Sequence, residues 1–143
     1  FDTSRFLFAS EWHPDRLVLP RGVFDRCLSV LEAAGATVAV QDARDAGARI
    51  AWKFEGELRA NQAKAVGAML ANDQGVLCAP PGSGKTVMGC AMIARARTST
   101  LILVHRAVLV DQWRDTAIRF LGLKRKDIGI WRGQARESLI DWM

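Results

Sequence analysis

The sequence predicts an α/β fold, a parallel sheet flanked by helices, preceded by a small α+β module. After residue 56, helical segments alternate with short apolar runs, a pattern typical of right-handed crossovers between parallel strands. Before residue 56 the segments are shorter and follow no such alternation. A third observation is a Gly-rich loop placed after an apolar run and before a helix. We therefore expect a module at 1–55 and a larger domain at 56–143.

The module is expected to contain one helix and four short strands. Apolar residues recur at helical spacing between residues 22 and 35, and Gly35 is placed to end that helix. Runs of apolar or alternating residues predict strands at 5–10, 15–20, 36–41 and 48–54.

The larger domain is expected to contain three helices, at 58–73, 85–97 and 107–122. Short apolar runs at 76–79 and 100–104 predict buried parallel strands between them, and residues 128–131 are a candidate third strand. In the last helix, four residues at spacings of three or four predict core packing rather than base stacking: Val110, Trp113, Ala117 and Leu121.

Composition indicates a cytoplasmic protein. No run of 18 apolar residues is present to span a membrane, and the first residues lack the order of a secretory signal. The chain does not begin with Met, so we expect a piece of a longer protein. Cys27, Cys78 and Cys90 lack metal-ligand spacing, and the last two lie in apolar stretches where a small buried thiol is expected.

Charge is distributed unevenly along the chain. Residues 1–57 carry seven Lys or Arg against nine Asp or Glu, and residues 58–143 carry thirteen against six. The half that contains the Gly-rich loop therefore has a net charge of +7, which favours a polyanionic partner such as nucleic acid or simply a solvated helical surface.

The Gly-rich loop reads APPGSGKT at residues 79–86. Glycines at 82 and 84 allow a tight path in which backbone N–H groups converge on phosphate at a helix N-terminus. In such a cradle, to which Pro81 and Ser83 also belong, Lys85 would reach the β- and γ-phosphates and the Thr86 hydroxyl would ligate Mg²⁺. Ala79 replaces the Gly that begins the common form of this pattern. The sequence therefore predicts binding of a nucleotide such as ATP.

Two flanking stretches add candidate residues. Gln62 lies 23 positions before Lys85 at the start of a helix, and its amide can both donate to and accept from a base edge. A glutamine on a helix is more often solvated. His105 and Arg106 follow the apolar run 100–104, so Arg106 is placed at the sheet edge where a phosphodiester backbone could be contacted. The alternative for Arg106 is an ordinary surface residue at a helix N-terminus.

Three stretches together resemble the superfamily 2 helicases of the DEAD/DEAH-box type: LRANQ at 58–62, APPGSGKT at 79–86 and LILVHRAVLVDQW at 101–113. They are most similar to the branch of the xeroderma pigmentosum group B and type III restriction translocases, and to the helicases of TOTE conflict systems. The resemblance covers residues 56–123 and implies a partial RecA-like domain that uses ATP and Mg²⁺.

The resemblance implies roles for individual residues. Lys85 and Thr86 would be catalytic, Thr86 as the Mg²⁺ ligand, and residues 81–84 would form the phosphate cradle. Gln62 and Arg59 would contact adenine, and Arg106 would contact DNA, either duplex or forked. The family implies ATP-driven movement on DNA by two motor domains.

This chain alone is expected to lack helicase activity. Hydrolysis in the family needs carboxylates at the end of an apolar strand that ends in Asp-Glu, and no Asp-Glu pair occurs in the sequence. Asp141 follows a short apolar run but is not expected to replace that pair. We therefore expect an N-terminal part of a motor, truncated before its second motif and without its C-terminal half.

Two further expectations follow. A parallel sheet cut after two or three strands leaves an unpaired edge, which predicts self-association through that edge. The alternative function is a non-catalytic DNA-binding module whose phosphate loop is vestigial; its DNA affinity would fall steeply with salt and ignore Mg·ATP. A small-molecule kinase is disfavoured because no arginine-rich lid follows the loop.

Overall fold

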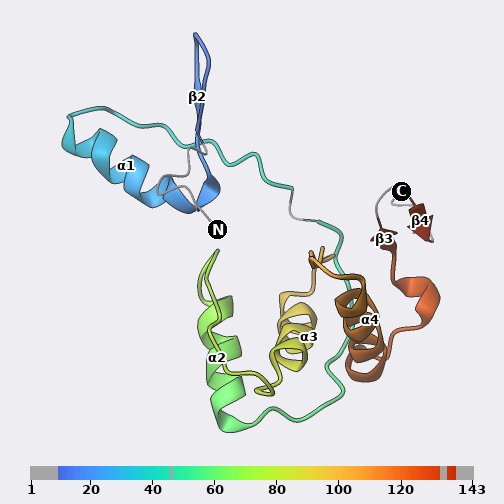
Figure 1. Cartoon of the computed structure of the whole chain (residues 1–143). Coiled ribbons are helices and arrows are strands. Elements are labelled where there is room, and N and C mark those ends of the chain that lie inside the picture. The colour runs from blue at the N-terminus through green and yellow to red at the C-terminus, as the bar shows by residue number, and fades with distance from the viewer. Residues whose placement is uncertain (1–9, 46, 133–134, 138–143) are drawn as a thin grey trace, which may run out of the picture. The chain divides into compact units, whose positions relative to one another are not determined.

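The computed structural model describes residues 10–45, 47–132 and 135–137. The chain divides into two compact units between Arg44 and Asp45. The second unit carries the Gly-rich loop and three of the four α-helices shown in Figure 1. Residues 45–55, which the sequence places with the N-terminal module, fall within this second unit.

The first unit consists of a small hairpin and one helix. Strand β1 (Glu11–Trp12) pairs antiparallel with β2 (Leu17–Val18), and a 3-10 turn, η1 (Arg21–Val23), leads into α1 (Phe24–Ala33). The predicted helix is therefore confirmed, and Gly35 follows it with a φ of 78°. No strand forms at 36–41, and the predicted strand at 5–10 lies outside the described residues except for its last position.

The second unit is built on three helices, α2 (Ala60–Leu70), α3 (Lys85–Ala96) and α4 (Ala107–Leu121). Helix α3 packs against both α2 and α4 (Figure 1). A 3-10 turn, η2 (Arg125–Asp127), and an antiparallel hairpin of β3 (Ile130–Arg132) and β4 (Ala135–Glu137) follow. All three predicted helices are confirmed. Among the described residues, no helix has the length and apolarity to cross a membrane.

The core forms on the two faces of α3. On one face Cys90 and Ile93 pack with Ala117 and Leu121 of α4, and on the other Met88 and Ala91 pack with Val66 of α2. The inward positions expected for α4 are thus confirmed at Ala117 and Leu121.

An extended segment at 49–55 closes this core from one side. Ile50, Trp52 and Phe54 alternate with exposed residues and pack against the α3–α4 cluster. The Ile50 N–H donates to the Arg97 carbonyl at 3.0 Å, and the Phe54 ring stacks on Phe120 with centroids 5.8 Å apart. The predicted strand at 48–54 is therefore an extended segment with one isolated bridge, not a strand of a sheet.

The structure does not show the predicted parallel sheet. Residues 76–79 and 100–104 have no strand structure, and both small sheets are antiparallel hairpins. A strand exists only through hydrogen bonds to a neighbour. Within the described ranges, no backbone hydrogen bond pairs 76–79 or 101–104 with another segment. The candidate third strand at 128–131 overlaps β3, which pairs with the segment that follows it.

Candidate functional site

The Gly-rich loop enters α3 through two left-handed glycines. Gly82 has a φ of 75°, and Gly84, the N-cap of α3, has a φ of 83°. A Cβ at Gly84 would lie only 2.7 Å from the Nε2 atom of Gln62. Position 84 therefore requires glycine for two reasons, its backbone conformation and the close approach of Gln62.

Backbone donors gather where the loop meets the helix. The N–H groups of residues 84–87 have no hydrogen-bond acceptor among the described residues. They lie at the N-terminus of α3, where the aligned peptide dipoles add partial positive charge. In the described part of the chain, the buried Ser83 hydroxyl also has no hydrogen-bond partner. Such a set of donors suits an anion with several oxygens, so the loop has the chemistry of a phosphate cradle.

Lys85 folds back over the loop that precedes it. Its Nζ donates to the carbonyl of Ala79 at 2.8 Å and to that of Pro80 at 2.9 Å. The side chain is exposed, so these bonds compete with water and are easily exchanged. The ammonium is thus held against the backbone at the start of the loop.

Gln62 joins the start of α2 to this loop. Its side chain is buried, with 5% exposed. The Oε1 atom accepts the Arg59 N–H at 2.9 Å, and the Nε2 atom donates to the Ser83 carbonyl at 2.8 Å. Both ends of the amide are therefore engaged within the protein, and Gln62 fixes the loop in this structure. The adjacent Arg59 is exposed and is the N-cap of α2.

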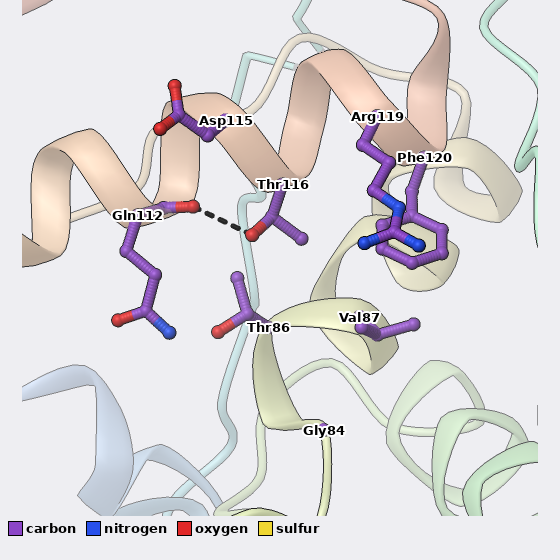
Figure 2. Close-up of a pocket in the computed structure, with 8 residues that line it drawn as sticks. All are labelled: Gly84, Thr86, Val87, Gln112, Asp115, Thr116, Arg119 and Phe120. Atoms are coloured by element: carbon purple, nitrogen blue, oxygen red, sulfur yellow. Dashed lines mark hydrogen bonds between the residues drawn. The ribbon is translucent and has the colours of Figure 1, made fainter.

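Thr86 lines an open depression of about 480 Å³ between the first turn of α3 and one face of α4 (Figure 2). Phe120 of α4 also lines it, together with four α4 side chains that carry polar groups: Gln112, Asp115, Thr116 and Arg119. The Arg119 guanidinium lies over the Phe120 ring at 5.2 Å. These residues were not predicted from the sequence. The pattern that could have revealed them is their spacing of three and four residues along the polar face of α4.

Arg106 is not bonded to the Gly-rich loop within the described residues. It is the N-cap of α4, with extended backbone and an exposed side chain. Among the described residues, no hydrogen bond or ion pair joins Arg106 or His105 to the Gly-rich loop. The structure therefore brings together Gln62, Arg59, Ser83 and Lys85, and leaves Arg106 free to face a partner.

The cysteines near the loop differ from each other. Cys90 in α3 is fully buried, and burial raises the pKa of its thiol to about 11, so the expected buried thiol is confirmed there. Cys78 is exposed, so the same expectation is wrong at that position. The reason is that residues 76–79 have no neighbouring strand to cover them. Asp141 lies outside the described residues.

The chain is similar to proteins of known families. Residues 55–140 match the family described as type III restriction enzyme, res subunit. The chain is 40% identical over 80 residues to the DNA 3'-5' helicase XPB of Kineococcus radiotolerans, covering 56% of this chain and 14% of that protein. It is 36% identical over 81 residues to the DNA 3'-5' helicase XPB of Mycobacterium tuberculosis, covering 57% and 15% respectively.

A third relative is the putative DNA 3'-5' helicase Rad25 of Haloarcula marismortui, 44% identical over 63 residues, or 44% of this chain and 10% of that protein. The chain thus spans between 10% and 15% of the length of these three relatives.

Proposed function

Because the chain belongs to the type III restriction enzyme, res subunit family, and with it to the XPB-like branch of the superfamily 2 helicases, we propose that its Gly-rich loop binds ATP with Mg²⁺. The observation that carries this proposal is the row of four backbone N–H groups at 84–87 that have no acceptor among the described residues. A triphosphate supplies the acceptors that these donors lack.

Each residue of the loop has a task in this proposal. Lys85 exchanges the carbonyls of Ala79 and Pro80 for oxygens of the β- and γ-phosphates. The Thr86 hydroxyl holds Mg²⁺, which when bound neutralises charge on the phosphates. Gly82 and Ser83 complete the cradle, with the unpartnered Ser83 hydroxyl as a further donor. Pro81 stiffens the entry to the turn.

The adenine side is assigned to Gln62 and Arg59. Gln62 already uses both ends of its amide, on Arg59 and on Ser83. Each end keeps one further hydrogen-bonding position, a second N–H on Nε2 and a second lone pair on Oε1, so contact with the base can be added to these bonds and would couple base recognition to the loop. Arg59 is exposed and can also approach the base.

We assign DNA contact to Arg106 and propose that the chain is part of an ATP-dependent DNA helicase or translocase. The relatives named above are DNA 3'-5' helicases, which supports DNA as substrate and 3'-5' movement. The exposed guanidinium of Arg106 suits a phosphodiester. Duplex or forked DNA, a second motor domain as partner and membership of the TOTE conflict type belong to this same proposal.

We further propose that the chain alone binds ATP without sustained turnover. Phosphoryl transfer to water needs carboxylates that order the metal ion and the attacking water. The 143 residues contain no Asp-Glu pair, and no group of three His, Cys, Asp or Glu side chains in the described part of the chain is placed to hold a metal ion.

The apolar segments beside the loop support a sheet that is completed by a partner. Val76, Leu101 and Leu103 are 87%, 82% and 84% exposed, which is unusual for residues of this kind. We propose that 76–79 and 101–104 become strands of a parallel, RecA-like sheet over 56–143 when neighbouring strands pair with them. A second copy of the chain would pair with the same edges, so light scattering should detect self-association.

Equilibrium titration with Mg·ATP tests the proposal. We expect Lys85→Ala to weaken binding at least tenfold and Lys64→Ala, an exposed lysine on α2, to leave it unchanged. Unchanged affinity in Lys85→Ala would overturn the assignment. The alternative, a DNA-binding module with a vestigial loop, would be favoured by salt-sensitive DNA binding in a chain that has no measurable affinity for Mg·ATP.

A further inference from the structure

The C-terminal end of α3 differs from the ends of α1 and α4. Each of the three helices ends in a left-handed residue: Gly35 with a φ of 78°, Gly122 with 63° and Arg97 with 57°. Arg97 is the only non-glycine with positive φ among the described residues. Glycine adopts this conformation at a helix end without steric cost, whereas an L-residue does not.

The fold makes no use of the Arg97 side chain. The Arg97 N–H donates to the Ile93 carbonyl at 3.1 Å, and its carbonyl accepts from the Ile50 N–H at 3.0 Å. Both are backbone bonds that glycine would make equally well. The guanidinium is exposed and has no partner among the described residues. The left-handed backbone at Arg97 therefore has a conformational cost that no contact of its side chain within the described residues offsets.

Two more arginines lie beside it. Arg49 stands opposite Thr98 in an antiparallel bridge, and Arg95 occupies the last turn of α3. Both are exposed, and neither forms an ion pair within the described part of the chain. The helix dipole stabilises Arg95 at this end, but it does not explain Arg49, which is outside the helix.

The bridge holds this surface in a fixed arrangement. The Ser99 N–H donates to the Ala48 carbonyl at 2.8 Å, and the Ala48 N–H donates to the Ser99 hydroxyl at 3.1 Å. A Cβ at Gly47 would lie 2.8 Å from that hydroxyl, so the segments approach closely. The Thr100 hydroxyl donates to the Thr98 carbonyl at 3.0 Å, which adds a further bond beside the bridge.

We propose that the basic surface formed by Arg49, Arg95 and Arg97 binds the phosphodiester backbone of a nucleic acid. Guanidinium groups bind phosphate through paired N–H donors, and Ser or Thr hydroxyls commonly add uncharged contacts. The proposal goes beyond the ATP and Arg106 assignments. Helix α3 has 12 residues, about 18 Å, so this surface is separate from the phosphate loop at its other end.

The test is binding of duplex DNA of arbitrary sequence, without nucleotide, over a range of salt concentrations. In Arg97→Gly we expect several-fold weaker binding and a reduction of about 1 in the slope of log K against log salt. The thermal midpoint of the same variant should stay unchanged or rise, because glycine suits the backbone of position 97 better. Arg97→Lys should retain the slope.

Arg125→Gly is the matched control, since it removes one exposed arginine from η2 in the same unit. A slope in Arg97→Gly equal to that of the unmodified chain, or an equal loss in Arg125→Gly, would overturn the proposal. So would displacement of DNA by polyglutamate at equal charge concentration, which would indicate an acidic protein as the partner. Arg106→Ala, measured beside these, reports separately on the DNA contact assigned to Arg106.

Discussion

The two ends of α3 share a left-handed backbone conformation but have different residues in it. At the N-terminus, Gly84 has a φ of 83°. A Cβ on Gly84 would lie 2.7 Å from the Nε2 atom of Gln62. At the C-terminus Arg97 has a φ of 57° and an exposed side chain. A left-handed residue is therefore needed at both ends, but only the N-terminal one excludes a side chain.

The two ends of α3 therefore differ in what they are able to bind. The N-terminal end presents free N–H groups and a positive dipole to small anions, so it works through the backbone. The C-terminal end carries the negative end of the helix dipole, so an anion can be bound there only through cationic side chains. Glycine at position 84 follows from its backbone conformation and the approach of Gln62, whereas the exposed arginine at position 97 places positive charge at the negative end of the dipole.

The largest effect is expected from Gly84→Ala at the N-terminal end. Left-handed backbone and the 2.7 Å approach of Gln62 Nε2 should together lower the free energy of unfolding by about 2–3 kcal/mol and abolish Mg·ATP binding. Chemical denaturation and nucleotide titration measure the two effects.

Gly67→Ala is the control for this change. Gly67 lies within α2, its φ is not positive, and a Cβ there meets nothing within 4 Å. The substitution should therefore raise stability by about 0.5–1 kcal/mol, as expected from helix propensity. Equal losses in both variants would contradict a special role for position 84.

The next effect is expected in the middle of α3, where neither end is altered. A Cβ at Gly89 would overlap the ring of Trp113, so Gly89→Ala forces α3 and α4 apart. We expect the free energy of unfolding to fall by about 1–2 kcal/mol. Affinity for Mg·ATP, measured well below the unfolding midpoint, should change little. A large loss of affinity would show that the loop depends on the α3–α4 contact.

Sequence alone was sufficient for the helices and for the loop. Helices α2, α3 and α4 satisfy their backbone groups locally, so apolar spacing and terminal residues such as Gly122 predict them. The segments at 76–79 and 100–104 have the composition of strands, but no backbone hydrogen bond pairs them with a neighbour within the described residues, and pairing is not encoded within a segment. The strands predicted there are therefore not confirmed.

The site was predictable to a similar extent. The spacing of Gly82, Gly84 and Lys85 predicts the loop, because these residues act through local backbone geometry. The bonds of Gln62 to Arg59 and Ser83, and the α4 side chains beside Thr86, depend on how helices pack. Packing brings together residues far apart in the chain, which no local pattern specifies.

A smaller effect is expected from Gln62, which ties α2 to the N-terminal end of α3. Gln62→Ala removes both amide bonds and should cost about 1 kcal/mol, with weaker binding of Mg·ATP. Gln62→Glu retains the acceptor for the Arg59 N–H but places a carboxylate against the Ser83 carbonyl. We expect Gln62→Glu to weaken binding more than Gln62→Ala does; the reverse order would argue against a role for the Ser83 bond.

The smallest effect concerns the buried thiol between the two ends. Burial raises the pKa of Cys90 from 9.0 to about 11, so the folded state binds its proton more tightly than the unfolded state does. This contribution to stability is present below pH 9 and is lost as the pH rises through about 11. Thermal midpoints measured from pH 8 to pH 11 should fall less in Cys90→Ala than in the unmodified chain.

The central claim is that phosphate binds the backbone at the N-terminal end of α3. Amide chemical shifts recorded during titration with Mg²⁺ and a non-hydrolysable ATP analogue test it most directly. We predict that the amides of residues 82–87 shift with a common affinity, while the amide of Arg97 stays in place. Saturable binding that leaves residues 82–87 unshifted would contradict the account.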